Sequence, residues 1–186
     1  SAPKPMQVGG PPIWVAARDP NSHEFAISQG CNVQVTPLWQ GDGEITKLMD
    51  TFKEACAKFP EVQRPEIMLL NHTYIAADAA DAQQAAGEIN SFFCNFGAWF
   101  KNERPVSQGR IEPLTEEDIA AHPFYTADAM LRDNVIATPN DAVARIKTYA
   151  ELGYDEYAFW IDSGMSFARK KASLQRFIND VMPAFA

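Results

Sequence analysis

A short polar segment, residues 18–22, holds the side chains best suited to binding a ligand. The segment reads RDPNS and directly follows an apolar, β-favouring stretch. Asp19, Asn21 and Ser22 are residue types that cap helix N-termini, and Pro20 is tolerated in a first helical turn. A helix that begins directly after a strand offers unpaired backbone N–H groups and the positive end of its dipole, which suit an anion such as phosphate. An ordinary strand-to-helix turn that binds nothing has the same pattern, so both interpretations stay open.

Histidines are the other candidates for chemistry, as general bases. His72 falls in the middle of an expected strand, where a structural role is favoured. His23 lies just inside the helix that follows residues 18–22, and His122 lies in an irregular region. No carboxylate partner is evident for either of them along the sequence. The sequence therefore predicts no particular catalytic residue.

The cysteines and histidines do not form a metal-ligand pattern. Cys31, Cys56 and Cys94 are widely spaced and lie among apolar residues, and no cysteine or histidine is within four residues of another. A metal site needs clustered ligands, so none is expected. Three separate cysteines are typical of buried, reduced thiols, which favours a cytoplasmic protein.

The elements that must position these residues alternate between strands and helices. Such alternation predicts an α/β fold with a parallel sheet. The clearest helix, residues 44–59, has its apolar residues on one stripe of 3.6-residue period. Strands are expected at 12–17, 32–38, 66–76 and 156–161, a short extended segment at 135–138, and helices at 44–59, 78–100, 139–152 and 167–182.

Residues 101–134 form an irregular insertion with several prolines. Two short helices are expected within it, at 115–121 and 126–132. If Thr115 caps the first of them, the third helical position holds Asp118 rather than the Glu or Gln of a usual capping box, which weakens that interpretation. An excursion of this length usually serves a function or an interface.

Two helices have strongly biased faces. The aromatic residues of helix 78–100 are expected to pack in a core rather than to bind a cofactor, although such a helix also suits the wall of a pocket or a subunit interface. The charged run 169–171 is expected to be solvated rather than to bind an anion.

Composition limits the class of protein. A chain of 186 residues with 46% hydrophobic residues is expected to fold as a globular domain. A net charge of −8 without any basic block argues against a nucleic-acid partner. No apolar run reaches the roughly 18–20 residues that a membrane helix needs, so no membrane partner is expected.

Several separated motifs resemble the luciferase-like flavin monooxygenases, the bacterial luciferase superfamily. PPIWVAARDPNSHEFA, residues 11–26, is similar to the fifth βα unit of that family. The similarity covers nearly the whole chain, and the motifs come in the family's order. The further motifs are RPEIMLLNHTYIAAD (64–78), INSFFCNFGAWFKNERPVSQG (89–109), NVIATPNDAVARIKTYAELGYDEYAFWIDSGMSF (134–167) and KKASLQRFINDVMPAF (170–185).

The resemblance implies the C-terminal half of a (β/α)8 TIM barrel. A complete barrel has eight strands and about 250 residues, whereas about four parallel strands with covering helices are expected here. The expected organisation is a lead-in at 1–10 and a partial barrel at 11–186 that contains the insertion at 101–134. Four parallel strands cannot close, and an open sheet exposes its edges and one apolar face. The chain is therefore expected either to be a fragment of a longer protein or to complete itself with another chain. That other chain would be the missing N-terminal half-barrel or a second copy, which would make a homo-oligomer.

The resemblance also implies a reaction and a cofactor site. The family oxidises small organic substrates with O₂ and reduced FMN, which a separate NAD(P)H-dependent flavin reductase supplies. Carried over by position, Ala17 and Arg18 would offer backbone N–H groups, and Ser22 a hydroxyl, to the FMN phosphate. The Arg18 guanidinium would either pair with the phosphate or point to solvent, and Trp160 would either flank the flavin ring or pack in the core. The alternative function is a non-catalytic flavin-binding or assembly half-barrel that needs a partner chain.

Overall fold

The computed structural model describes residues 4–100 and 104–186, which form two compact units. The first unit comprises residues up to 37, 42–70 and 149–158, and the second comprises 38–41, 71–148 and 159–186. Within the described ranges, no helix is both long enough and apolar enough to cross a membrane.

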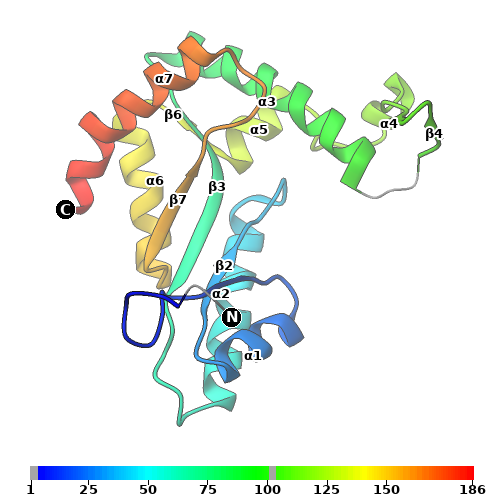
Figure 1. Ribbon diagram of the computed structural model, residues 1–186. Coiled ribbons are helices and arrows are strands. Elements are labelled where there is room, and N and C mark those ends of the chain that lie inside the picture. Colours follow the sequence, from blue (N-terminus) through cyan, green and yellow to red (C-terminus); the bar gives the residue numbers. More distant parts are fainter. Residues whose placement is uncertain (1–3, 101–103) are drawn as a thin grey trace. The chain divides into compact units, whose positions relative to one another are not determined.

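The first unit is built on parallel strands. β1 (Trp14–Ala16) pairs with β2 (Asn32–Val35), and β2 pairs with the first residues of β3 (Ile67–Ile75). The strand β7 (Glu156–Trp160), whose first residues belong to this unit, also pairs with β3. Figure 1 shows these strands in blue, cyan and orange. The predicted parallel α/β arrangement is confirmed.

The helices of the first unit are α1 (Pro20–Ser28) and α2 (Gly41–Lys58). The apolar stripe predicted for the second helix is buried, because its members Ile45, Leu48 and Phe52 are at most 1% exposed. The helix begins at Gly41 rather than at residue 44, so the predicted start was three residues late. Its first turn carries Asp42 and Glu44, and negative charges stabilise a helix N-terminus.

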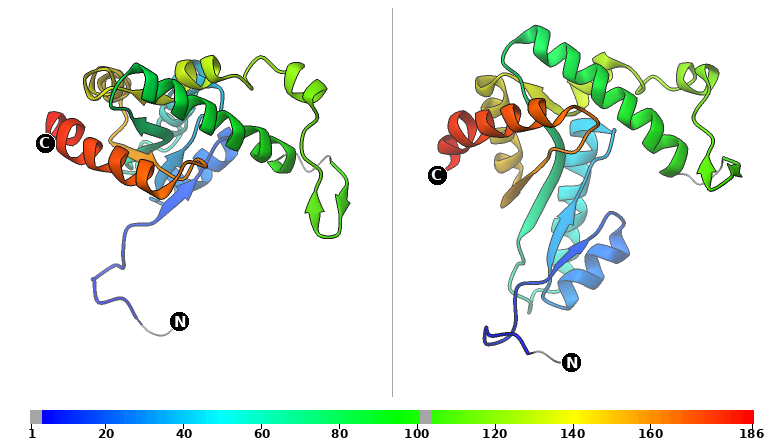
Figure 2. Two further views of the ribbon diagram at one scale, coloured as in Figure 1. Left: turned by 90° about the horizontal axis from the view of Figure 1, so that it is seen from above. Right: turned by 45° about the horizontal axis from the view of Figure 1, so that its top comes forward.

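The second unit contains the end of β3, which pairs in parallel with β6 (Val135–Ala137). The other elements of the second unit are α3 (Ala79–Phe100), β4 (Val106–Ser107), β5 (Arg110–Ile111), α4 (Glu116–Ala120), α5 (Ala127–Asp133), most of α6 (Pro139–Leu152), the end of β7, α7 (Phe167–Arg176), the π-helical turn η1 (Phe177–Val181) and the 3-10 turn η2 (Met182–Phe185). The long helix α3 packs against α5 (Figure 1). Figure 2 shows the hairpin β4–β5 beyond the C-terminal end of α3.

Three local expectations need correction. The first strand, expected at 12–17, is shorter: β1 spans only Trp14–Ala16, the preceding Ile13 is 63% exposed, and β1 is an edge strand that pairs only with β2 among the described residues. The capping box at Thr115 is complete, because the Asp118 carboxylate reaches the Thr115 N–H at 2.8 Å while Thr115 Oγ1 accepts the Asp118 N–H at 3.1 Å. The cysteines are unpaired, but all three are half-buried rather than buried.

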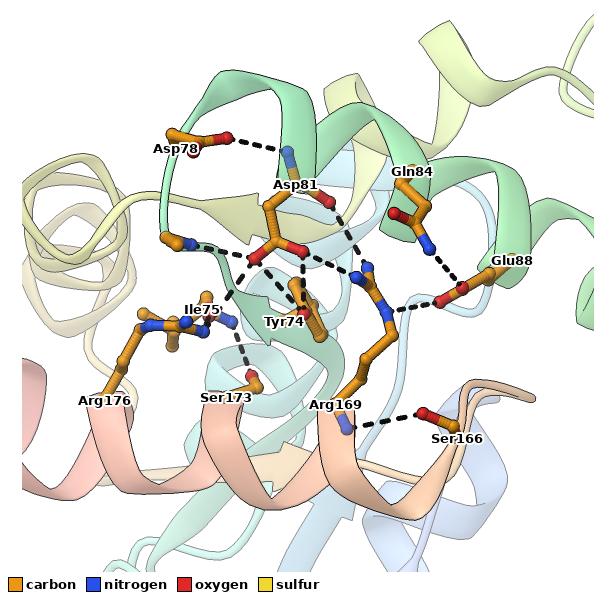
Figure 3. Close-up of polar contacts among 11 residues, drawn as sticks. Tyr74, Ile75, Asp78, Asp81, Gln84, Glu88, Ser166, Arg169, Ser173 and Arg176 are labelled. Atoms are coloured by element: carbon orange, nitrogen blue, oxygen red, sulfur yellow. Dashed lines mark hydrogen bonds and ion pairs between the residues drawn. The ribbon is translucent and has the colours of Figure 1, made fainter.

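A polar cluster joins α7 to α3 and to the end of β3 (Figure 3). Its centre is the Asp81 carboxylate, which accepts hydrogen bonds from the Ala77 N–H at 2.9 Å and the Tyr74 hydroxyl at 3.0 Å. Arg169 on α7 donates to Asp81 at 2.8 Å and to Glu88 at 3.1 Å. The cluster is therefore a network that spans the two helices.

Two further bonds from α7 reach the strand itself. The Ile75 N–H donates to Ser173 Oγ at 2.7 Å, and Arg176 donates to the Ile75 carbonyl at 3.1 Å. The charged run at 169–171 is thus only partly solvated: Arg169 is paired as described, Lys170 bonds to Asp162, and Lys171 is exposed. The expectation was wrong for Arg169, because its acidic partners lie on a different helix.

The cluster predicts an acid-dependent contribution to stability. Burial by itself would raise the pKa of Asp81, but the Ala77 N–H, the Tyr74 hydroxyl and Arg169 together lower it. We expect Asp81→Asn to reduce the free energy of unfolding by about 2 kcal/mol at pH 7, because it leaves Arg169 without its closest charge partner. The contribution is complete above the usual aspartate pKa of 3.8 and is lost as the pH falls through the lowered folded-state value.

Urea unfolding at pH 7 and pH 3 measures this difference. Asp180→Asn, which removes the same charge from an exposed position of η1, is the matched control and should leave stability nearly unchanged. An equal loss of unfolding free energy in both variants would contradict the role of the cluster. So would a stability difference between the wild type and Asp81→Asn that is as large at pH 3 as at pH 7.

Candidate functional site

The first candidate site lies at the start of α1, where the sequence predicts it. Asp19 is the N-cap residue and Pro20 is the first helical residue. The Asp19 carboxylate accepts the Ser22 N–H at 3.1 Å and the Ser22 hydroxyl at 2.5 Å. These bonds, the hydroxyl first, lower the pKa of Asp19, so its carboxylate is charged at neutral pH.

Three of the donors predicted to hold a phosphate already have partners within the chain. The Ala17 N–H donates to the Gln34 carbonyl at 3.0 Å, as a continuation of the β1–β2 pairing. The Arg18 guanidinium donates to Glu44 Oε1 at 2.7 Å. This pairing with α2 is neither of the two alternatives expected for Arg18. Ser22 is engaged by Asp19.

A cavity of about 340 Å³ opens beside these groups. The Lys47 ammonium is also there, 3.9 Å from Glu44 Oε2. A guanidinium, an ammonium, a hydroxyl and a helix start are the donor types that bind phosphate. Two carboxylates currently balance the two cations, so a phosphate fits these donors only if it replaces the carboxylates. The lining residues are Arg18, Asp19, Pro20, Glu44, Lys47, Leu48 and Thr51.

Glu44 is the residue that sequence reasoning missed at this site. The sequence places it in the first turn of an amphipathic helix, where an acid has an ordinary role at the positive end of the dipole. Its pairing with Arg18 joins residues 26 positions apart, and no local pattern indicates that pairing.

The second candidate site surrounds Trp160, in the other unit. Trp160 stacks on the ring of His72, with centroids 4.0 Å apart and planes 20° apart. His72 is 1% exposed, and its Nδ1 lies 2.6 Å from the Ser163 hydroxyl oxygen. Phe93 meets His72 edge-on at 4.7 Å. One face of Trp160 is thus covered by a buried imidazole.

His72 is buried and uncharged in this arrangement, and its structural role remains a prediction of the sequence. Burial lowers its pKa to about 3, so the imidazole is neutral at pH 7. Its Nε2 has no hydrogen-bond partner among the described residues, and neither do the side-chain nitrogen and oxygen of the adjacent Asn71. Sequence reasoning missed Ser163 and Asn71, because a serine in a Ser-Gly turn and an asparagine within a strand carry no distinctive signal.

The predicted cofactor residues therefore divide between the two units. Ala17, Arg18 and Ser22 come together at the start of α1, whereas Trp160 belongs to the second unit. Throughout residues 4–100 and 104–186, no group of three or more His, Cys, Asp or Glu side chains is placed to hold a metal ion.

Comparison with known proteins identifies the family. The model of the luciferase-like monooxygenase family matches residues 1–156. The chain belongs to the luciferase-like monooxygenase family. It is 63% identical, over all of its 186 residues, to the oxygenase component of the flavin-dependent trigonelline monooxygenase of Acinetobacter baylyi. The chain spans about half of that relative, 52% of its length.

Solved structures of luciferase-like proteins share the fold. The monooxygenase RslO1 from Streptomyces bottropensis is 20% identical with a TM-score of 0.67, and the match covers 100% of this chain and 51% of that one. The oxygenating constituent of 3,6-diketocamphane monooxygenase from Pseudomonas putida, in complex with FMN, is 16% identical with a TM-score of 0.61, covering 94% and 49%. The expected half of a luciferase-like TIM barrel is confirmed.

The neutral state of His72 predicts how stability depends on pH. The unfolded chain binds a proton at this histidine near pH 6.5, whereas the folded chain does so only near pH 3. Stability is therefore complete above about pH 6.5 and falls as the pH decreases. Between pH 7 and pH 5 we expect the wild type to lose about 2 kcal/mol through this group.

Urea unfolding of the wild type and of His72→Phe at both pH values tests this expectation. The variant keeps an aromatic ring beside Trp160 but cannot titrate, so its loss between pH 7 and pH 5 should be about 2 kcal/mol smaller. Val106→Ala, at an exposed residue without a titratable group, is the control and should keep the wild-type dependence. Equal pH dependence in wild type and His72→Phe would refute the buried neutral imidazole.

Proposed function

We propose that this chain is the C-terminal part of a flavin-dependent monooxygenase that oxidises a small organic molecule with O₂ and reduced FMN. The observation that carries the proposal is the 63% identity, along the entire chain, to the oxygenase component of a flavin-dependent monooxygenase. The word "component" in the relative's name supports a separate NAD(P)H-dependent flavin reductase as a partner. A cytoplasmic location is in keeping with the three unpaired cysteines.

The start of α1 is the proposed site for the FMN phosphate. Arg18, Ser22 and the adjoining backbone would hold it, with Arg18 moving from Glu44 to the phosphate and Ser22 from Asp19. The opposite face of Trp160, away from His72, is the face proposed to flank the flavin ring. When bound, reduced flavin supplies the electrons that activate O₂. The contribution of the chain's own residues is to bind and orient the cofactor.

Competition between carboxylates and phosphate gives a sharp test. Glu44→Gln releases Arg18, and Asp19→Asn removes a negative charge while keeping a residue that caps helices equally well. We expect each variant to tighten FMN binding about three- to tenfold, and Arg18→Gln to weaken it about tenfold. Flavin fluorescence quenching measures the Kd, with this chain co-expressed with the N-terminal half of the Acinetobacter relative.

Two controls separate phosphate binding from general effects. Glu24→Gln removes a charge of the same sign from α1 at a residue that pairs with Lys58 instead, and should leave the Kd unchanged. Riboflavin lacks the phosphate, so its binding should not respond to Arg18→Gln. An FMN affinity that is insensitive to Arg18→Gln would reject the α1 site.

An exposed apolar stripe supports the need for another half-barrel. Five large apolar residues lie 7, 4, 4 and 3 positions apart along α7, η1 and η2. Each spacing is close to one or two turns of the α-, π- or 3-10-helical segment that it crosses, so the residues follow one face. Their exposed fractions run from 37% to 81%. A face of this kind typically marks an interface. The residues are Phe167, Leu174, Ile178, Met182 and Phe185.

The charged residues that bind α7 to α3 lie on the opposite face. Arg169 and Arg176 are about half a turn away from the stripe around the same helix. The stripe is thus left uncovered by the described residues because the polar side of the helix faces α3. The N-terminal half of the barrel is the proposed occupant, since the chain spans only 52% of its relative.

Substitution within the stripe tests that assembly. We expect Ile178→Asp to weaken association of this chain with the N-terminal half of the relative at least tenfold, because a charge would be buried in an apolar interface. Asn179→Asp adds the same charge next to it, off the stripe, and should have little effect. Analytical ultracentrifugation of the two halves gives the affinity.

The outcome also addresses the alternative function. Tight association without substrate oxidation in the presence of reduced FMN would favour a flavin-binding or assembly half-barrel. Unchanged association in Ile178→Asp would contradict the stripe as the interface.

A further inference from the structure

A second pocket is lined by residues of the insertion and of α3, none of which is among the groups proposed to hold the phosphate. It has a volume of about 290 Å³ and lies where the C-terminal part of α3 meets α4 and the loop before α5. All of its lining residues belong to the second unit. They are Gly97, Ala98, Arg104, Leu114, Asp118, His122, Phe124 and Tyr125.

Aromatic rings form one part of the pocket wall. Phe124 stacks on Trp39 and on His122, with centroids 5.7 and 5.1 Å apart and both pairs of planes 18° from parallel. Tyr125 meets Phe124 edge-on at 4.4 Å. Such a stack offers flat π surfaces, on which a planar ring packs well and a cation is attracted.

The hydroxyl of Tyr125 is a donor available to a ligand. It lies directly over Gly97, since a Cβ placed on that glycine would be 1.9 Å from the oxygen. No hydrogen-bond partner for the hydroxyl is found in the described part of the chain, and Tyr125 lines the pocket. Burial raises the pKa of Tyr125, so the hydroxyl keeps its proton at neutral pH.

The pocket also carries one cation and one anion. Arg104 donates to Asp118 at 2.7 Å and to the Glu112 carbonyl at 3.1 Å. The capping box fixes Asp118, and the bonds from Thr115 hold the pKa of Asp118 below its usual value. Both groups are therefore charged at neutral pH, and their net charge is zero.

We propose that this pocket binds a planar aromatic zwitterion, with its carboxylate on Arg104 and Tyr125 and its cationic ring against the aromatic stack and Asp118. The inference rests on the proposed function, because it makes this pocket the substrate site of the oxygenase. The relative's name supplies a candidate of this class: trigonelline is an N-methylpyridinium that carries a carboxylate. A neutral pair of opposite charges beside flat rings complements such a molecule.

The same arrangement disfavours ligands that carry a single charge. Nicotinate has the carboxylate but no cationic nitrogen, so its net charge would face Asp118 without compensation. N-methylnicotinamide has the cationic ring but no carboxylate, so Arg104 would gain no new partner. Selectivity for the zwitterion is thus a property of the paired charges.

Binding of the three compounds tests the proposal. Isothermal titration calorimetry uses the 186-residue chain alone and the chain co-expressed with the N-terminal half of the relative. We expect trigonelline to bind at least tenfold more tightly than nicotinate or N-methylnicotinamide. Arg104→Gln should weaken trigonelline about tenfold, and Tyr125→Phe about threefold. Arg110→Gln, at an exposed arginine of β5, is the matched control and should have no effect.

Each outcome bears on one proposal. Equal affinity for all three compounds, or trigonelline binding that neither Arg104→Gln nor Tyr125→Phe changes, would overturn the pocket assignment. So would the absence of trigonelline binding in both preparations. FMN binding is measured separately. FMN binding without trigonelline binding would reject the pocket assignment and leave the flavin proposal standing. Trigonelline binding without FMN binding would reject the flavin proposal. Tyr125→Phe keeps the ring over Gly97, so its effect does not depend on a loss of folding.

Discussion

The Asp81 carboxylate is the group on which the arrangement of the C-terminal helix depends. It accepts the Ala77 N–H at the end of β3, the Tyr74 hydroxyl from within that strand, and Arg169 from α7. One acidic residue thus connects a strand end with two helices. Because the arginines of α7 reach toward this acid, the polar face of that helix is turned to α3 and its apolar face is left for another surface. Ionic pairing on one side of the helix therefore leaves the apolar face on the other side exposed.

A different use of carboxylates operates at the start of α1. There Asp19 and Glu44 occupy donors that a phosphate would otherwise bind. Internal acceptors keep Arg18 and Ser22 in place without a ligand, since an unpaired guanidinium or N–H group near the surface would be mobile or solvated. The consequence is that the free energy of binding an anion is only the difference between its bonds to these donors and the donors' bonds to the carboxylates. Under the proposed function, FMN binding at this site would therefore be readily reversible.

Local signals in the sequence predicted much of this architecture. The stripe of Ile45, Leu48 and Phe52 follows the helical period, and Asp19 stands directly before Pro20, so both the second helix and the first cap were predicted. The order of several motifs predicted the family. The rule that the third position of a capping box holds Glu or Gln failed at Thr115, because the shorter Asp118 side chain also reaches the Thr115 N–H.

The interactions that shape the candidate sites left no comparable signal. Arg18 and Glu44 are 26 positions apart, Arg169 and Asp81 are 88 apart, and His72 and Ser163 are 91 apart. Contacts of this kind depend on how helices and strands pack, and no periodicity or spacing within one element encodes them. The stacking of Trp160 on His72 is of the same kind, so the sequence could indicate only that both rings lie on strands.

The close approach of Tyr125 to Gly97 ties the evolution of two positions together. Because a methyl group at position 97 would lie 1.9 Å from the phenolic oxygen, even alanine there requires the tyrosine to move. A lineage that replaces Tyr125 with a smaller residue removes that restriction, and position 97 then becomes tolerant of side chains. The two positions should therefore covary among descendants of this sequence, with a substitution at 125 preceding one at 97.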